Sequence, residues 1–446
     1  MPLTISRILH AGYVVECDST LIAFDPIVEN PFSRNCHAFP DVRFDLEQVR
    51  QLKFDAVFIS HFHDDHCSLE SLDVFDRATP IYLYCQFQAL FAMIRALGFA
   101  DVRPLKVDVG AVVGAVEVIP REAMDADVDC LFHIRAAGLN VLNVVDSWID
   151  PDHLPALAAH GPWDMVMWPF QTMREIEVLS PSRATAASGA VPPEWIAQLE
   201  ALHPRYIVPS SCQFLQEPWS WYNHAFFPIS YARFQTEVEA ALPFARVVRM
   251  NPSVAVTLDA QGLTPAAPLA WVIPVGEQNV DYQYRADLPV PPTADIARQF
   301  AALNEAQCAQ VLAYCASGLL DKYRDMELPE ESFFEAARVW RLSLFDHAGA
   351  ERQFFYRIEG DTIARADGDT APSWTTEIPM AKLYAALEQG ESLTSMYMRI
   401  NNGVFDAATE RDLEDAELMD DPLIRCLFND AFGAYQAAQL RRLQSR

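Results

Sequence analysis

Short apolar runs alternate with helical stretches over the first 258 residues of the chain. The runs are rich in β-branched and aromatic residues and are bounded by turn residues, which predicts strands. The expected strands are Leu3–Ile8, Tyr13–Glu16, Leu21–Phe24, Ala56–Ile59, Ile81–Tyr84, Val116–Ile119, Cys130–Ala136, Val141–Val145, Met165–Trp168, Tyr206–Val208 and Val254–Leu258. The expected helices are Leu69–Phe75, Gln86–Leu97, Pro193–Leu202 and Ile229–Ala241. This succession fits an α/β fold in which two sheets lie between helix layers, an αββα sandwich.

The pattern changes after residues 261–268, a segment rich in Pro, Gly and Ala that is typical of a linker. We therefore expect two domains, residues 1–262 and residues 263–446. The expected elements of the second are helices from Thr293 to about Tyr323, a helix from Pro329 to Leu344, a hairpin of Arg352–Ile358 with Thr362–Arg365, a helix Pro379–Gln389 closed by Gly390, and a last helix from about Pro422 to Arg442. We expect an α+β accessory domain that serves substrate enclosure or dimerisation.

The composition limits the classes of partner. The chain has 446 residues, 51% of them hydrophobic, with a formal net charge of −28 and a pI near 4.6. Such a charge argues against binding to nucleic acid or to an anionic membrane. Nine cysteines without a Cys-x-x-Cys pair, and a start without a charged-then-apolar leader, predict a reduced cytoplasmic protein. A coenzyme A thioester would need a basic patch, for which Arg121 and Arg174 are the candidates.

One motif indicates a metal centre: residues 60–67 read Ser-His-Phe-His-Asp-Asp-His-Cys. The apolar run before it predicts a buried strand that ends at these histidines. On an extended segment His61 and His63 point the same way and can share one cation. Asp65 and His66 fall on the following turn, where a second cation lies within their reach. The alternative is a surface loop whose polar residues are merely solvated.

Asp146 is the candidate for a carboxylate that bridges the two ions. It follows the apolar run of residues 140–145 immediately, so it lies at another strand end. The alternative is that Asp146 is the N-cap of a helix beginning at Ser147. The histidine motif favours the metal role.

These residues resemble the metallo-β-lactamase fold. The resemblance covers about residues 1–258 and rests on the strand and turn Thr20–Pro26, the His-x-His-x-Asp-His motif and the strand that ends in Asp146. Hydrolases of this fold usually supply two more histidines. Residues 119–127 and 207–213, where the resemblance would place them, contain none. Glu122 is the candidate replacement for the first, with Asp125 and Asp127 as rivals.

A site of three imidazoles and three carboxylates suits iron better than zinc. The chain is therefore similar to a subgroup of this superfamily, the non-haem di-iron monooxygenases of antibiotic biosynthesis. The resemblance implies two iron ions and O2 as cosubstrate. His61, His63 and Glu122 would hold one iron and Asp65 and His66 the other, with Asp146 between them.

The monooxygenase hypothesis implies partners as well as a metal. The substrate would be a bulky, mainly apolar small molecule, in one version an acyl thioester of coenzyme A or of a carrier protein. An electron donor would be needed, and a homodimer is a further expectation. The alternative is a dinuclear hydrolase of a thioester, lactone or phosphodiester that uses zinc. A binding protein with a vestigial site ranks third.

Two more segments are candidates for the walls of a substrate pocket. Residues 169–193 read as a long loop that serves as a lid, or as an idle surface loop. Residues 214–234 are rich in aromatic side chains, which suits either a tunnel for an acyl group or a core. His224 lies among them, and a buried structural histidine is its more ordinary role.

Overall fold

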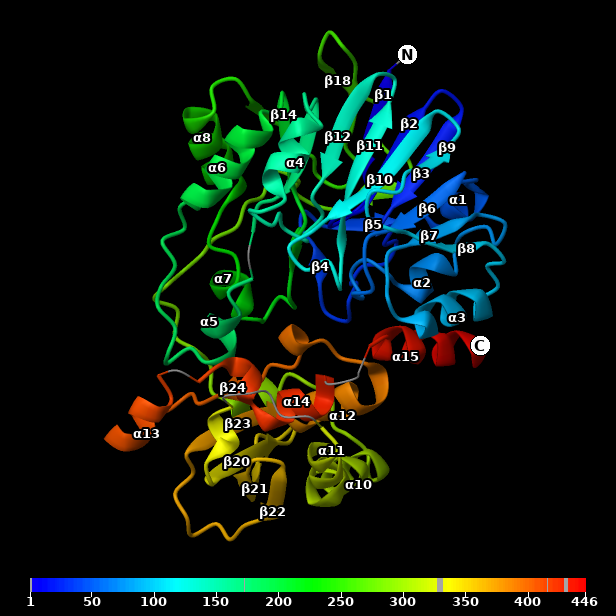
Figure 1. Ribbon diagram of the computed structural model, residues 1–446. Helices are drawn as coiled ribbons and strands as arrows, with labels where there is room; N and C mark the ends of the chain where they lie inside the picture. Colours follow the sequence, from blue (N-terminus) through cyan, green and yellow to red (C-terminus); the bar gives the residue numbers. More distant parts are fainter. Residues whose placement is uncertain (1, 172, 327–331, 415, 429–431) are drawn as a thin grey trace. The chain divides into compact units, whose positions relative to one another are not determined.

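The computed structural model describes residues 2–171, 173–326, 332–414, 416–428 and 432–446 (Figure 1). Its contacts divide the chain into two units. The first consists of Met1–Met173, Ser188–Arg285 and Gln439–Arg446, and the second of Arg174–Ala187 and Ala286–Ala438.

Two mixed sheets form the frame of the first unit. The eight-stranded sheet has, in spatial order, β18 (Leu263–Ala266), β17 (Ala255–Leu258), β1 (Leu3–Arg7), β2 (Tyr13–Cys17), β3 (Thr20–Phe24), β6 (Ala56–Ile59), β7 (Ile81–Leu83) and β8 (Val102–Pro104). The seven-stranded sheet has β16 (Arg246–Val247), β14 (Tyr206–Ser210), β13 (Met165–Pro169), β12 (Leu139–Asn143), β11 (Cys130–Ala136), β10 (Val116–Glu122) and β9 (Ala111–Val113).

The main core lies between these sheets. Alternate residues of each strand point into it, such as Ile5 and Phe58 from the first sheet and Phe132 and Met167 from the second, and all four are fully buried. Helices flank the pair in Figure 1: α1 (Leu46–Gln51), α2 (Leu69–Leu72) and α3 (Gln88–Ala96) beside the first sheet, and α4 (Leu154–Ala159), α6 (Pro193–Leu202) and α8 (Tyr231–Ala241) beside the second. The predicted αββα sandwich is confirmed.

Two short ribbons and one short helix complete the first unit. The ribbons pair β4 (His37–Ala38) with β15 (Phe214–Leu215), and β5 (Val42–Phe44) with β19 (Val272–Pro274). The helix is α7 (Tyr222–Ala225). Most aromatic side chains of residues 214–234 are buried, whereas Trp219 is 36% exposed, so this segment is mainly core.

The expected linker at residues 261–268 is wrong. β18 lies within it and pairs with β17 from Ala255↔Ala266 to Leu258↔Leu263, so the segment is the second arm of a hairpin. The first unit therefore continues to Arg285, past the expected boundary at residue 262. It also includes the last residues of the chain, Gln439–Arg446. One Pro and one Ala within β18, with Gly262, Ala267 and Pro268 beside it, gave this edge strand the composition of a loop, and an edge strand tolerates Pro.

The second unit has a five-stranded sheet in the order β22 (Thr362–Arg365), β21 (Glu351–Glu359), β20 (Arg338–Phe345), β23 (Trp374–Pro379) and β24 (Arg399–Ile400). Its helices are α5 (Glu175–Leu179), α9 (Thr293–Ala297), α10 (Glu305–Ala313), α11 (Leu319–Arg324), α12 (Met380–Gln389), α13 (Ala407–Asp412) and α14 (Pro422–Phe428). The predicted α+β class, the hairpin and the helix closed by Gly390 are confirmed.

Three expectations for this half are wrong. Residues 338–344, expected in a helix, belong to β20, which pairs with β21 on one side and β23 on the other. Packing in the middle of a sheet outweighs helical propensity here. The start of that expected helix, at Pro329, lies outside the described residues. The expected last helix is two, α14 and α15 (Ala434–Gln444). The expected loop at residues 169–193 contains α5, and residues 174–187 belong to the second unit.

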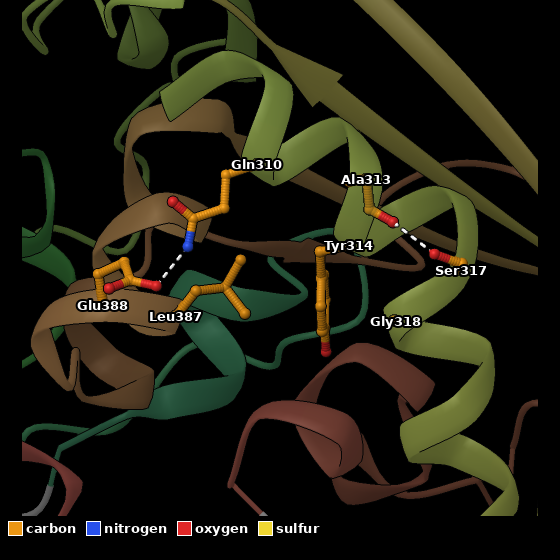
Figure 2. A pocket seen from close by; sticks show the side chains of 7 residues that line it. All are labelled: Gln310, Ala313, Tyr314, Ser317, Gly318, Leu387 and Glu388. Atoms are coloured by element: carbon orange, nitrogen blue, oxygen red, sulfur yellow. Dashed lines mark hydrogen bonds between the residues drawn. The ribbon is translucent and has the colours of Figure 1, made fainter. Parts of the chain in front are cut away.

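A π-helical turn, Tyr314–Gly318, joins α10 to α11 beside a cavity of about 350 Å³ (Figure 2). Gly318 permits this turn to lie against the Tyr314 ring, since a Cβ there would come 3.1 Å from Cδ2 of the ring. In the part of the chain that the structure describes, no helix combines the length and apolar character needed to span a bilayer.

Asp421 ties α14 to the sheet of the second unit. It is fully buried, and its Oδ1 accepts hydrogen bonds from the backbone N–H groups of Leu423 (2.9 Å) and Ile424 (3.1 Å), at the start of α14. Its Oδ2 accepts from Trp374 Nε1 (2.7 Å) and from the Thr376 hydroxyl. One carboxylate thus satisfies four donors from two strand positions and a helix terminus.

We predict that Asp421→Ala lowers the free energy of unfolding by about 2 to 4 kcal/mol, because it removes an N-cap and leaves buried donors without partners. Asp421→Asn, which keeps one accepting oxygen, should lose about half as much. Urea unfolding of the full chain, followed by tryptophan fluorescence, measures both. Equal unfolding midpoints for Asp421→Ala and the parent chain would contradict this account.

Candidate metal centre

The histidine motif lies at the carboxyl end of β6, whose four residues are all buried. His61 directly follows Ser60, and the chain then turns back, with the N–H groups of His66 and Cys67 donating to the carbonyl oxygen of His63 (3.1 and 2.8 Å). The turn brings the rings together: the His61 centroid is 4.5 Å from that of His63, edge to face, and 4.0 Å from that of His66, at a tilt of 38°. The motif is therefore compact.

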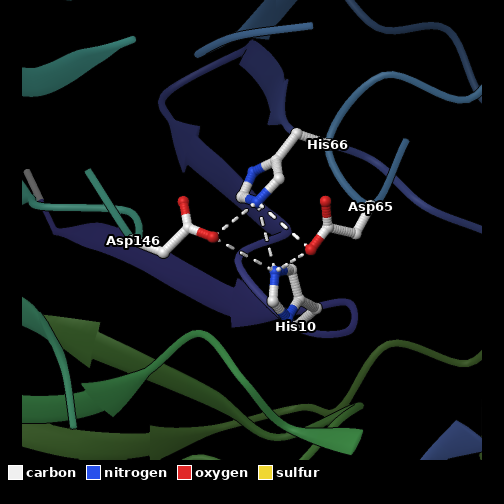
Figure 3. Close-up of side chains that lie close together, drawn as sticks. All are labelled: His10, Asp65, His66 and Asp146. Atoms are coloured by element: carbon white, nitrogen blue, oxygen red, sulfur yellow. Dashed lines mark hydrogen bonds and ion pairs between the residues drawn. The ribbon is translucent and has the colours of Figure 1, made fainter. Parts of the chain in front are cut away.

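Four side chains from three segments converge beside this turn (Figure 3). They are His10, Asp65, His66 and Asp146, and one ligand atom of each lies within 4.8 Å of all the others. His10 Nε2 is 3.1 Å from Asp65 Oδ2 and 3.2 Å from His66 Nε2, which is 3.1 Å from Asp146 Oδ2. Two ligand atoms of a tetrahedral zinc ion are roughly 3.3 Å apart, so this spacing fits one shared cation.

A second position lies on the other side of Asp146. Its Oδ1 is 3.9 Å from His61 Nε2, and both atoms are buried with no hydrogen-bond partner in the described part of the chain. Two buried polar atoms that face each other unpaired are costly unless something else satisfies them. A cation between them would do so, and the exposed ring of His63 lies alongside. Asp146 would then bridge the two positions.

Asp25 orients the histidines from behind. It is fully buried at the end of β3 and accepts hydrogen bonds from Ser60 N–H and Ser60 Oγ, both at 2.7 Å. Its Oδ2 is also 3.1 Å from His66 Nδ1, and Ser60 Oγ is 2.9 Å from His61 Nδ1. These contacts occupy the Nδ1 atoms and leave Nε2 of both rings for a metal ion.

The cluster also rests on unusual backbone conformations. His10, Asp25 and Val145 have φ values of +52°, +39° and +62°. Such left-handed conformations cost about 1 to 3 kcal/mol each in non-glycine residues and gather at functional sites. At Val145 the conformation turns the chain out of β12 immediately before Asp146. Residues 147–150 form no helix, so the alternative role of Asp146 as a helix N-cap is not seen.

Charge sets the protonation of the cluster. Burial lowers the pKa of His61 well below its usual range, so this imidazole is neutral and its lone pair is available. Burial also acts to lower the pKa of His66, but the carboxylates of Asp146 and Asp65 outweigh it and raise that pKa well above 6.5. Without a cation, His66 therefore keeps a proton that stands in for the missing positive charge.

His10 is a candidate ligand that the sequence analysis missed. It follows β1 by three residues and is fully buried. The buried Arg7 guanidinium holds this turn, because it donates to the carbonyl oxygens of His10 and of Pro209 (3.0 Å) and to the Tyr13 hydroxyl (2.6 Å). A histidine just beyond an apolar strand was a usable signal, the same one that singled out Asp146.

The structure does not bring Glu122 to the cluster. Its side chain is 42% exposed at the end of β10, and its Oε2 lies 3.3 Å from His153 Nε2. The rivals Asp125 and Asp127 are exposed, and Asp127 Oδ1 accepts from Gln86. The structure groups His10, Asp65, His66 and Asp146, and His61 and His63 lie beside them, so we take these six residues as the candidate ligands in place of the expected set. His224 binds the carbonyl oxygen of Gln283 (2.9 Å) instead.

Asp129 is the buried carboxylate of residues 123–129, the loop that joins β10 to β11. It is 9% exposed, and its Oδ1 has no hydrogen-bond partner among the described residues. Burial, together with the negative charge of Asp146, raises its pKa to about 7. The loop reaches the metal centre, because the N–H group of Met124 is 3.3 Å from the carbonyl oxygen of Ser147.

Comparison with known proteins gives structural neighbours alone. No protein-family model and no curated protein matches the chain. Similar solved structures include the metallo hydrolase Igni18 from Ignicoccus hospitalis KIN4/I, with 17% identity, a TM-score of 0.40 and coverage of 58% of this chain and 99% of that one. They also include the diiron β-hydroxylase CmlA from Streptomyces venezuelae, with 18% identity, a TM-score of 0.41 and coverage of 57% of this chain and 54% of that one. A third is the metallo-β-lactamase fold protein YhfI from Bacillus subtilis, with 12% identity, a TM-score of 0.39 and coverage of 57% of this chain and 99% of that one. Since a hydrolase and a hydroxylase both occur among them, we take no function from them.

We predict that His10→Ala binds about one metal ion per chain where the parent chain binds about two, because the variant removes one of the ligands around the first position. Metal analysis after dialysis against a metal buffer measures this. Glu122→Gln and His153→Ala are matched controls that should keep about two ions. Loss of an ion from Glu122→Gln, with two ions retained in His10→Ala, would reverse the assignment.

Metal binding should also release about one proton per chain at pH 7, because His66 is protonated in the metal-free chain and must be neutral to bind a metal. Calorimetric titration with zinc in buffers of different ionisation enthalpy gives the number of protons. We expect the release to fall as the pH rises through the raised pKa of His66. A release near zero at pH 7 would contradict the assigned protonation.

Proposed function

We propose that the chain is a metal-dependent hydrolase with two adjacent cations. The observation that carries this proposal is the donor set: four imidazoles and two carboxylates, with Asp146 facing both positions through different oxygens. Imidazole-rich sets suit zinc, whereas the argument for iron depended on a third carboxylate at Glu122. The donor set therefore favours the dinuclear hydrolase, the alternative in the sequence analysis, over the monooxygenase expected from the sequence.

Bound cations would polarise the substrate carbonyl and lower the pKa of a water molecule to near neutrality. The chain's own residues contribute positioning and proton transfer. Asp25 and Ser60 fix the His66 and His61 rings, and Arg7 fixes the turn that carries His10. Asp129 Oδ1, buried and without a hydrogen-bond partner among the described residues, is our candidate for the atom that holds a proton near pH 7.

The charge of the loop beside the metal centre limits the charge that a substrate can carry. Residues 122–129 carry four carboxylates, at Glu122, Asp125, Asp127 and Asp129, and no Lys or Arg. The carboxylates of this loop oppose the approach of a phosphodiester or another polyanion. We therefore propose a neutral carbonyl substrate, a thioester or a lactone. The acyl group is the part that would enter the site, so a coenzyme A or carrier portion would stay outside it.

A di-iron monooxygenase is the second candidate, and one observation favours it. Asp129 offers a buried carboxylate in the loop where the resemblance asks for a third acidic ligand, close enough to Asp146 for that negative charge to help raise its pKa. That activity would need O2, two iron ions and an electron donor.

The two functions differ in metal and in oxygen. We predict that the chain, purified without chelators, holds about two zinc ions and hydrolyses model thioesters or lactones equally well in air and under argon. Asp146→Asn should lower kcat by roughly 100-fold or more, because it weakens a ligand of both positions. Asp150→Asn, a nearby surface change, is the matched control. Iron-dependent O2 consumption with reductant, and no hydrolysis, would establish the second candidate instead.

A further inference from the structure

The first unit contains a second hollow, with a volume of about 940 Å³, that the metal centre does not use. Residues from 37–41, 215–224 and 275–283 line it. All three segments belong to the first unit. We call this hollow the ribbon cavity, because the β4–β15 ribbon forms one of its walls. Its volume lies in the range of small-molecule sites.

The ribbon cavity and the metal centre lie on opposite faces of β15. Phe214 faces the metal centre, where its ring centroid is 6.1 Å from that of His10 and 5.8 Å from that of Phe32. The next residue, Leu215, lines the ribbon cavity, as expected for alternation along a strand. None of the six candidate metal ligands lines it. A ligand in the ribbon cavity would therefore be separate from the substrate of the metal centre.

Aromatic rings provide one apolar part of the lining. The rings of Phe39 and Tyr282 are 4.8 Å apart between centroids. Tyr282 is fixed, because its hydroxyl donates to the carbonyl oxygen of Cys212 (2.6 Å). A fixed pair of rings suits a flat apolar group and attracts a cation held over a ring face.

Three carboxylates and two imidazoles, those of His37 and His224, lie in the lining. Asp41, Glu277 and Asp281 line the ribbon cavity, and no Lys or Arg does. Asp281 accepts from the N–H groups of Tyr231 (2.7 Å) and Ala232 (3.0 Å), so α8 fixes its carboxylate. Asp41 uses Oδ1 to accept from Asn30 (2.8 Å), and Glu277 uses Oε1 to accept from Asn279 N–H (2.7 Å). The second oxygen of Asp41 and that of Glu277 can each accept a ligand N–H.

A metal ion does not suit these groups. Among the described residues, the close set of ligand atoms found at the metal centre has no counterpart in the ribbon cavity. The cavity is also far larger than one ion requires. An anion would meet three carboxylates, and the lining offers it no Lys or Arg but only the imidazoles of His37 and His224. The second of these already contacts the carbonyl oxygen of Gln283 (2.9 Å), so an anion is the less favourable ligand.

We propose that the ribbon cavity binds a small organic amine that carries an aromatic or flat apolar group. The ring packs against Phe39 and Tyr282, and the ammonium group donates to Asp41 and Glu277. This site is independent of the proposed hydrolytic activity, since no metal ligand takes part in it.

Isothermal titration of the metal-loaded full chain with tryptamine tests the proposal, and indole-3-acetate, with a similar ring and the opposite charge, is the matched ligand. We expect tryptamine to bind at least roughly tenfold more tightly than indole-3-acetate. Asp41→Asn combined with Glu277→Gln should weaken tryptamine by roughly tenfold, and Phe39→Ala should weaken both ligands. Asp152→Asn, an exposed carboxylate outside the cavity, is the control and should bind as the parent does.

Metal content and circular dichroism of each variant show whether the fold is retained. Equal affinity for the two ligands would overturn the proposal, as would tryptamine affinity that survives the double substitution. The absence of tryptamine binding at millimolar concentration would overturn it as well. None of these outcomes bears on hydrolysis by the metal centre.

Discussion

The contact of Asp146 with two imidazoles is the constraint on which the rest of the first unit depends. One oxygen of this carboxylate lies 3.1 Å from His66 and the other 3.9 Å from His61, and both rings are about 1% exposed. Ionisable groups packed this densely are stable only when opposite charge or a cation compensates them. The metal-free chain retains a proton on His66 for this purpose, and bound cations would take over the role. Packing these imidazoles and carboxylates together raises the free energy of the metal-free chain, and the same groups make the site selective for metal ions.

The sandwich supplies the rigidity that such a cluster requires. Its ligands come from the ends of β1, β6 and β12, which belong to both sheets, so the packing of the two sheets fixes their separation. Buried polar groups behind them, chiefly Asp25 and Arg7, then fix the orientation of the rings and turns. Strained φ values at His10, Asp25 and Val145 persist because the surrounding core over-determines these positions.

The proposed function rests on the donor set and not on the fold. A fold does not by itself fix an activity, so function has to be argued from the site. The replacement of Glu122 by His10 in the candidate set changes the balance from hard oxygen donors toward imidazole, and with it the preferred metal. Asp129 remains as an acidic neighbour whose raised pKa suits proton transfer. In the proposed function, the four carboxylates of residues 122–129 would also disfavour an anionic substrate.

The sequence by itself determined the strand pattern, the αββα class and the dense part of the metal motif. Periodicity and a local run of histidines are properties of neighbouring residues, so they can be read from a string of letters. Tertiary structure alone decided that His10 joins the cluster, that Glu122 turns to His153 and that residues 261–268 form a hairpin. The first two depend on which strand ends meet at one edge of the sandwich, between residues far apart in the chain such as His10 and His66, and local propensity carries little information about such pairing. The hairpin is local, but its Pro, Gly and Ala content is that of a loop, so only its pairing with β17 reveals a strand.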